Sequence, residues 1–284
     1  MLVSGSWIAK EFYFYPVSGI QYPISLRFKQ WVVDASNLLV RGGVSLIIIR
    51  MEPPKQGGRA IKRKVLELLK SQDFEKALKD MGRLPALRVI NPLFSFLYNK
   101  DEALKGAAVA AMGAIVGKVA DENMEAARVI MRRLMWNLND ESGGIGWGSP
   151  EAMGEIMAVH EGLAKEYVHI LISYSREDGN YLEYEGLQRG LLWGIGRLAQ
   201  ARPELVKEGV THLMPYMRSP DAGVRGHAAW IMGLLKAEEA RSELEALTED
   251  EAEFQMVLDR RPFVRRVKEL AKEALKRLPS KGLD

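Results

Sequence analysis

The chain contains no cysteine, so it can form no disulfide, no thiolate metal site and no cysteine nucleophile. This absence fits the reducing cytoplasm, where we expect the protein to act. There is also no run of about 18 apolar residues, the length that a membrane span requires, and we expect no membrane association. The four histidines share no metal-ligand spacing. We therefore predict neither a metal nor a cofactor.

Excess charge is also lacking over most of the chain. The formal charge of +3 arises in the first 50 residues, which hold five basic and two acidic side chains out of totals of 40 and 37. The remainder therefore holds 35 of each sign. A nucleic-acid-binding domain usually carries a basic stripe, so this balance disfavours nucleic acid as a partner.

The first 50 residues differ in composition from everything that follows. They contain eight of the chain's 23 aromatic residues and no helical period, and a Pro-Pro pair and a Gly-Gly pair then break the chain. We predict an irregular leader over residues 1–57, a repeat domain over 58–278 and a tail over 279–284. Two interpretations of the leader stay open. Either the leader is translated from sequence upstream of a natural start at Met51, or it is a genuine but poorly ordered cap of the repeat domain.

Five stretches of the remaining sequence align without gaps and recur every 37 to 42 residues. They are 104–115, 145–156, 187–198, 224–235 and 264–275. One shared position holds Gly113, Gly154, Gly196 and Gly233, and then Glu273 in the last copy. A fixed period in this range is the signature of a solenoid built from helical pairs.

The best-formed copy carries the pattern V-R-x-x-A-A-x-x-x-G, at Val224, Arg225, Ala228, Ala229 and Gly233. This pattern resembles the second helix of the short HEAT-like repeat of the phycobilin-lyase type. The resemblance covers residues 59–278 and implies an α-solenoid. Such repeats serve lyases, scaffolds and DNA-repair glycosylases alike, so the resemblance implies a fold and not an activity.

First helices are expected before each of these stretches, separated from them by polar turns rich in Asp, Asn and Ser. They are expected at 84–98, 122–138, 164–174, 203–217 and 240–247. Apolar residues at helical spacing from Ile61 to Leu69, and a short helix closed by Gly82, predict an N-terminal cap. The fold class is therefore all-α, a right-handed α-solenoid of about five HEAT-like helix pairs with a helical cap and no sheet.

The helical period also predicts which way each side of the second helices faces. In the copy at 224–235, one side is entirely apolar and should be buried; it consists of Val224, Ala228, Ile231, Met232 and Leu235. The shared glycine and the positions three and seven residues before it fall on the opposite side, which should face the groove of the solenoid. Position −3 holds Ala110, Glu151, Trp193, Trp230 and Leu270, and position −7 holds Gly106, Trp147, Arg189, Gly226 and Arg266.

Three tryptophans on this groove side suggest an aromatic ladder formed by Trp147, Trp193 and Trp230. Exposed aromatic residues in a groove are typical recognition anchors. The alternative is that they fill gaps left by glycines between neighbouring helices. His227, beside Arg225 and Trp230, is the one histidine expected near the groove, whereas His160, His169 and His212 are expected to be ordinary structural or surface residues.

The second copy begins with a glycine-rich loop that delays its helix. Its candidate loop residues are Asp140, Glu141, Gly143, Gly144, Gly146 and Gly148. Ser149 is a suitable N-cap, and Pro150 suits the first helical position. Free N–H groups could receive an anion, but the surrounding acids favour an acidic, aromatic-edged pocket for a cationic or peptide group. A purely structural loop is the third interpretation.

Catalytic patterns are weak in this sequence. The paired carboxylates Glu151 and Glu155 lie one helical turn apart, which is usual for a solvated surface. A basic cluster near residues 260–268 is typical of a solvated chain end. We therefore expect a non-catalytic scaffold that binds a protein or peptide in its groove. The alternative is a HEAT-like DNA glycosylase or other nucleic-acid-binding protein, or a lyase or chaperone-like relative of the bilin-lyase repeat proteins.

Overall fold

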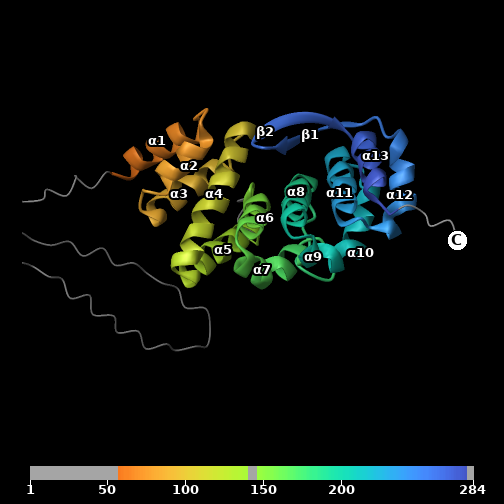
Figure 1. Cartoon of the computed structure of the whole chain (residues 1–284), viewed down its shortest axis with the longest axis horizontal. Helices are drawn as coiled ribbons and strands as arrows, with labels where there is room; N and C mark the ends of the chain where they lie inside the picture. The colour runs from red at the N-terminus through yellow and green to blue at the C-terminus, as the bar shows by residue number, and fades with distance from the viewer. Residues whose placement is uncertain (1–56, 140–145, 280–284) are drawn as a thin grey trace, which may run out of the picture. The chain divides into compact units, whose positions relative to one another are not determined.

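The computed structural model describes residues 57–139 and 146–279 of the chain. Helices form nearly all of this part, as Figure 1 shows. The α-helices are α1 (Gly58–Leu69), α2 (Phe74–Met81), α3 (Ala86–Leu97), α4 (Glu102–Glu122), α5 (Met124–Leu138), α6 (Ser149–Val159), α7 (Glu161–Ser173), α8 (Glu185–Ala201), α9 (Pro203–Val206), α10 (Val210–Leu213), α11 (Ala222–Leu235), α12 (Arg241–Ala246) and α13 (Val267–Arg277). Short 3₁₀ segments are η1 (Lys207–Gly209), η2 (Met214–Arg218), η3 (Glu238–Ala240) and η4 (Leu247–Glu249). Two strands, β1 (Glu253–Leu258) and β2 (Arg261–Arg266), complete the described elements.

The predicted helix pairs are all present. Helices α3, α5 and α7 pack against α4, α6 and α8, the broken segment from α9 to η2 packs against α11, and α12 packs against α13. The second helices then stack on one another in the order α4, α6, α8, α11 and α13. Helices α1 and α2 cover the first pair, because both contact the α3–α4 layer. The α-solenoid with an N-terminal helical cap is thus confirmed.

The predicted core face of α11 is also confirmed. Val224, Ala228, Ile231 and Met232 are completely buried, and Leu235 is 7% exposed. The opposite side of the same helix is buried as well, including Ala229 and Trp230. The apolar period therefore predicted the core face of α11 correctly. It did not predict that the opposite face would also be buried.

The repeat glycines face the next helix of the stack, so the prediction that they face the groove is wrong. A Cβ atom at Gly154 would lie 2.3 Å from the backbone oxygen of Gly194 on α8. Gly196 likewise accepts the ring of Trp230, and Gly233 accepts the backbone of Ala274. A side chain at these positions would push consecutive repeats apart, and this explains why the repeat has glycine there.

The expectation of no sheet is wrong at one place, near the C-terminus. Strands β1 and β2 pair antiparallel, with Leu258 opposite Arg261 across a two-residue turn. Both turn residues, Asp259 and Arg260, have positive φ angles of 47° and 66°. This is the geometry of a type I′ hairpin, for which Asp259 is a usual first residue, but Arg260 stands where glycine is normally found, so the sequence lacks half of the usual signal.

The hairpin also corrects the last predicted second helix, which begins at Val267 instead of 264. As a result, Arg266 is the last residue of β2. Leu270 is 2% exposed and lies in the core, so it does not face the groove.

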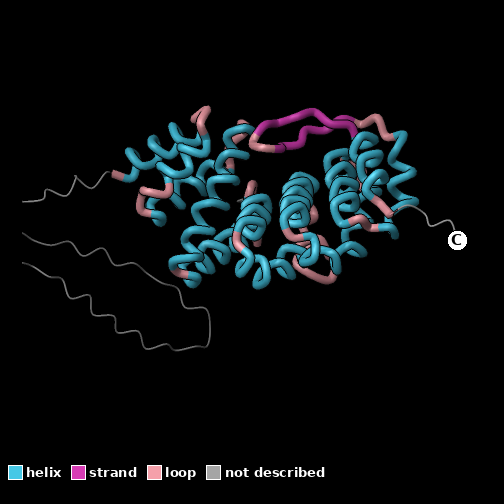
Figure 2. Tube along the Cα trace, in the orientation of Figure 1, coloured by secondary structure: helices cyan, strands magenta, loops and turns pink. Residues whose placement is uncertain are grey.

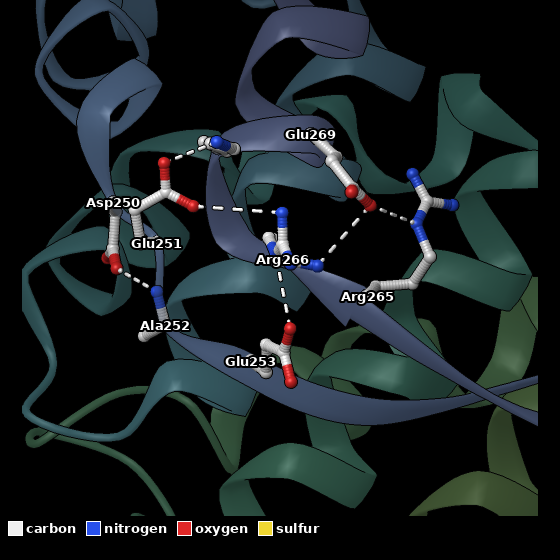
Figure 3. A network of polar contacts seen from close by, with 8 residues as sticks. Asp250, Glu251, Ala252, Glu253, Arg265, Arg266 and Glu269 are labelled. Carbon is white, nitrogen blue, oxygen red and sulfur yellow. Dashed lines mark hydrogen bonds and ion pairs between the residues drawn. The ribbon is translucent and has the colours of Figure 1, made fainter.

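Charged pairs fix the base of the hairpin, as Figure 3 shows. The Arg266 guanidinium lies 3.0 Å from a carboxylate oxygen of Glu253 across the two strands. Arg265 lies 3.1 Å from Glu269 on α13, and Lys268 pairs with Glu251. The basic cluster expected to be a solvated chain end therefore ties the hairpin to the last helix.

The hairpin reaches from the last repeats back to the first. Strand β1 contacts α11, and both strands contact α4. At its tip, the guanidinium carbon of Arg260 lies 3.9 Å from the centre of the Phe74 ring on α2. In Figures 1 and 2 the hairpin passes over the ends of α6 and α8 on the side away from α7 and α9. The groove side of the second helices thus has a roof.

Among the described helices, α4 is long and apolar enough to cross a membrane by length and composition. Two-thirds of its most apolar window, 67%, is buried inside the protein. It packs against α3, α5 and α6. This burial is the expected property of a solenoid core helix.

Candidate functional site

A cavity of about 370 Å³ lies between the hairpin roof and the second helices. Its walls come from α4, α6, α8, α11 and β1. The volume is at the lower end of the range for small-ligand sites. Because the roof belongs to the last repeat and the floor to the middle ones, residues more than 100 positions apart meet here.

Two of the three predicted groove tryptophans, Trp147 and Trp193, border this cavity. Trp147 meets Tyr184 edge to face, with ring centres 5.6 Å apart. Trp193 projects from α8, and its indole Nε1 donates a hydrogen bond of 2.7 Å to the backbone oxygen of Val257 in β1. Aromatic rings thus form one wall of the cavity, and one of them also holds the roof.

Glu151, also predicted, lies on the cavity wall on α6. One carboxylate oxygen is 3.6 Å from the Lys105 ammonium, which itself lies 2.8 Å from Glu102. The other oxygen, Oε2, has no hydrogen-bond partner in the part of the chain that the structure describes. Burial raises the pKa of the Glu151 carboxyl, and the neighbouring Lys105 ammonium opposes this shift only in part.

The same group of charges acts on Lys105. Burial alone would lower the pKa of its ammonium, but the Glu151 and Glu102 carboxylates outweigh burial and leave the pKa raised. Lys105 is therefore charged at neutral pH. Two carboxyl groups thus share this one ammonium at this end of the cavity.

Arg189 and His227 are the two predicted residues at the other end. Arg189 on α8 forms an ion pair of 2.8 Å with Asp221, the N-cap of α11. His227 is only 3% exposed. Its Nδ1 lies 2.6 Å from the backbone oxygen of Gly223, and a carbonyl oxygen only accepts, so Nδ1 carries the proton.

The second nitrogen of His227 is consequently a bare acceptor. Nε2 is buried and has no hydrogen-bond partner among the described residues. Burial lowers the pKa of His227 to about 4, so the ring is neutral at physiological pH. Two residues that border the cavity therefore each hold a buried polar atom without a hydrogen-bond partner among the described residues, Oε2 of Glu151 and Nε2 of His227.

The structure does not bring Trp230 and Arg225 to the cavity. Trp230 is 9% exposed, and its ring fills the space left by Gly196 on α8. Arg225 pairs with Asp250 at 2.7 Å and donates to the backbone oxygens of Ser219 and Pro220. Both residues hold neighbouring repeats together. Trp230 packs against α8, and Arg225 binds Asp250 in the segment before β1.

Of the predicted loop residues, Asp140, Glu141, Gly143 and Gly144 lie outside the described residues. Gly146 and Gly148 are buried and support the start of α6. Gly148 has a φ angle of 74° and serves as the N-cap, which corrects the prediction that Ser149 caps this helix. The left-handed conformation of Gly148 turns the chain so that α6 already begins at Ser149.

The sequence-based prediction missed the roof residues Phe254, Gln255 and Val257 and the wall residues Glu102, Lys105, Tyr184 and Asp221. One signal was available for the roof: residues 253–258 and 261–266 each hold one aromatic and one β-branched residue, on either side of two polar residues. The wall residues carry no comparable signal in the sequence.

The arrangement is suited to binding. It offers aromatic faces, buried acceptors and an excess of carboxylates. Within residues 57–139 and 146–279, no group of three or more His, Asp or Glu side chains is placed to hold a metal ion.

No family model matches the chain. An uncharacterized protein from Archaeoglobus fulgidus is 33% identical over 112 residues, which is 38% of this chain and 52% of that protein. The chain thus spans about half the length of this curated relative.

Solved structures similar to this chain include designed armadillo repeat proteins. A designed armadillo repeat protein in complex with the peptide (KR)4 is 16% identical, with a TM-score of 0.44 over 77% of this chain and 99% of its own. Computationally designed armadillo repeat proteins for modular peptide recognition are 16% identical, with a TM-score of 0.42 over 77% of this chain and 100% of theirs. At this identity the likeness concerns the helical repeats alone.

Proposed function

We propose that this chain is a non-catalytic binding scaffold that holds a peptide or protein segment in the cavity beneath the hairpin. The observation that supports this most strongly is the position of Trp147 and Trp193. Both border the cavity, whereas the equivalent Trp230 is used for packing. Amphipathic aromatic rings at a concave site are the usual anchors of protein recognition.

The helical repeats belong to the same proposal. Their assignment to the short HEAT type of the phycobilin lyases rests on the V-R-x-x-A-A-x-x-x-G pattern of α11. A cytoplasmic location rests on the absence of cysteine.

A nucleic-acid partner is the competing proposal, and the cavity disfavours it. Four carboxylates border the cavity, on Glu102, Glu151, Asp221 and Glu253, against two cations on Lys105 and Arg189. A phosphate backbone would meet a net repulsion there, since nucleic-acid affinity depends on neutralising phosphates with cations. Gel-shift titration with single- and double-stranded DNA at low salt should show no retardation that depends on Trp147 or Trp193.

The binding proposal is tested by selection from a random peptide library displayed on phage, against the full chain. The clones retained are then measured as synthetic peptides by tryptophan fluorescence. We expect Trp193→Ala and Trp147→Ala to weaken binding of the selected peptides by about 2 kcal/mol. Trp136→Ala serves as the control, because Trp136 is 71% exposed on α5 and does not border the cavity. Peptides that bind all three variants equally would overturn the proposal.

A further inference from the structure

The free edge of β1 faces the cavity. Opposite residues of an antiparallel pair alternate between hydrogen-bonded and non-bonded pairs. Val257 lies opposite Pro262, which has no N–H, so this is a non-bonded pair and the backbone groups of Val257 point away from β2. The hydrogen bond from Trp193 to the Val257 oxygen confirms that direction.

Gln255, two residues earlier, points the same way. It lies opposite Val264 in the next non-bonded pair and borders the cavity. The alternation also holds at the base of the hairpin, where the Val267 N–H donates to the Ala252 oxygen. Among the described residues, no hydrogen bond engages the backbone N–H or oxygen of Gln255. An open strand edge of this kind is a template for an added strand.

The charge of the cavity shows what that strand should carry. Lys105 is held by Glu102, Arg189 by Asp221, and Glu253 by Arg266. Among the described residues, Glu151 is left with only a share of Lys105 at 3.6 Å, and its Oε2 is buried without a hydrogen-bond partner. At the other end of the cavity, the buried Nε2 of His227 is also an acceptor without a hydrogen-bond partner among the described residues. The unsatisfied groups of the wall are thus acceptors, and the surplus charge is negative.

We propose that the cavity accepts an extended peptide segment whose lysine or arginine side chain is held by Glu151 while its backbone pairs with the free edge of β1 at Gln255. This inference rests on the proposed function and specifies the chemistry of the partner. The aromatic rings of Trp147 and Trp193 flank the aliphatic part of the basic side chain. Trp193 occupies the edge beside Val257, so the added strand is short and ends there.

The test uses the acetylated and amidated tripeptide Val-Arg-Val as the probe, measured with the full chain by tryptophan fluorescence. Replacing its arginine with citrulline removes the charge and keeps the shape. We expect the dissociation constant to rise about tenfold or more, as for a lost charge-assisted hydrogen bond. Free spermidine is measured in parallel, because it offers ammonium groups without a peptide backbone.

Backbone pairing is tested with peptides N-methylated at one position at a time. Successive N–H groups of a strand point to opposite sides. Methylation should therefore weaken binding about fivefold either at the arginine or at its two neighbours, and not at all three positions.

Two neighbouring carboxylates of α6 provide matched variants of the protein. Glu151→Gln should raise the dissociation constant of Val-Arg-Val about tenfold. Glu155→Gln should leave it unchanged, because Glu155 pairs with Arg197 at 2.7 Å and does not border the cavity. Burial penalises the charge of Glu151, so Glu151→Gln should melt no lower than the wild type, which separates a binding role from a structural one.

Equal binding of the citrulline and arginine peptides, equal binding by Glu151→Gln, or insensitivity to every N-methyl group would each overturn the inference. The proposed function would survive these results if the peptides selected from the library still required Trp147 and Trp193. Conversely, binding of spermidine alone, with no peptide bound, would overturn both.

Discussion

Helices α8 and α11 present the same repeat positions to the groove but use them differently. On α8, Arg189, Gly190 and Trp193 border the cavity. On α11, the matching residues are Gly226, His227 and Trp230. Gly226 lies beneath the Phe254 ring, where an added Cβ would come within 2.2 Å, and Trp230 fills the space over Gly196. The same repeat positions therefore have different surroundings in the two helices.

This difference shows that neighbours decide whether a repeat position is exposed. Trp193 lies half-buried beneath the hairpin, to which it donates a hydrogen bond. Trp230 is enclosed because Gly196 on the preceding helix leaves a space of its size and because the base of the hairpin covers α11. One helix thus contributes a wall to the cavity, whereas the next contributes mainly core.

The largest expected contrast lies between the two tryptophans. Trp230→Ala should lower the free energy of unfolding by about 3–5 kcal/mol, because it empties a buried site against Gly196 of α8. Trp193→Ala should cost only about 1–2 kcal/mol, since it removes one hydrogen bond and a partly buried ring. Urea denaturation followed by circular dichroism measures both.

Equal losses in the two variants would show that Trp193 is also a packing residue. In that case the cavity wall would be part of the core, and the contrast between α8 and α11 would disappear. A loss confined to Trp230 would separate the two positions as the structure does.

The sequence was sufficient for the repeats because glycine spacing and apolar period are local signals. Both follow from the packing of one helix on the next, which every repeat has to satisfy. Trp147, Glu151, Arg189, Trp193 and His227 were placed near one another from the same period, and all five border the cavity. The hairpin was not predicted, because the Asp259-Arg260 turn adopts positive φ angles without Asn or Gly. Trp230 could not be assigned from sequence either, since its burial depends on a glycine 34 positions away.

The second contrast concerns the pH dependence of stability. His227 on α11 occupies the repeat position that Gly190 holds on α8. His227 has a pKa of about 4 in the folded protein, chiefly through burial, whereas that of an unfolded histidine is near 6.5. Between these values the unfolded chain binds the proton and the folded chain does not. The stability present above the unfolded pKa is therefore lost as the pH falls from about 6.5 toward about 4.

The loss attributable to His227 should reach about 2 kcal/mol between about pH 7 and about pH 5. It is measured as the difference in pH dependence between the wild type and His227→Gln. Arg189 and Asp221, the charged groups near the ring, are present in both proteins. Glu151 and Glu155 have raised pKa values and act in the opposite direction, but their contributions cancel in the difference. Parallel curves for the two proteins would show that the ring is accessible to water.

The smallest expected effect on stability, and the most informative one for binding, comes from Gly190. An added Cβ would lie 2.6 Å from Oε2 of Glu151, the far end of a side chain that can rotate away. Since alanine favours a helix over glycine by up to about 1 kcal/mol, Gly190→Ala should leave stability within about 1 kcal/mol of the wild type or raise it. The carboxylate has to move, however, so binding of Val-Arg-Val should weaken although the charge is kept.

Gly194→Ala, one turn further along α8, is the control for Gly190→Ala. Its Cβ would meet the backbone oxygen of Pro150 at 2.5 Å, which α6 cannot relieve without moving, and the expected cost is about 1–3 kcal/mol. If Gly190→Ala proved as costly as Gly194→Ala, then α6 and α8 would be in rigid contact along their whole length, and α8 would have no cavity side distinct from its packing side.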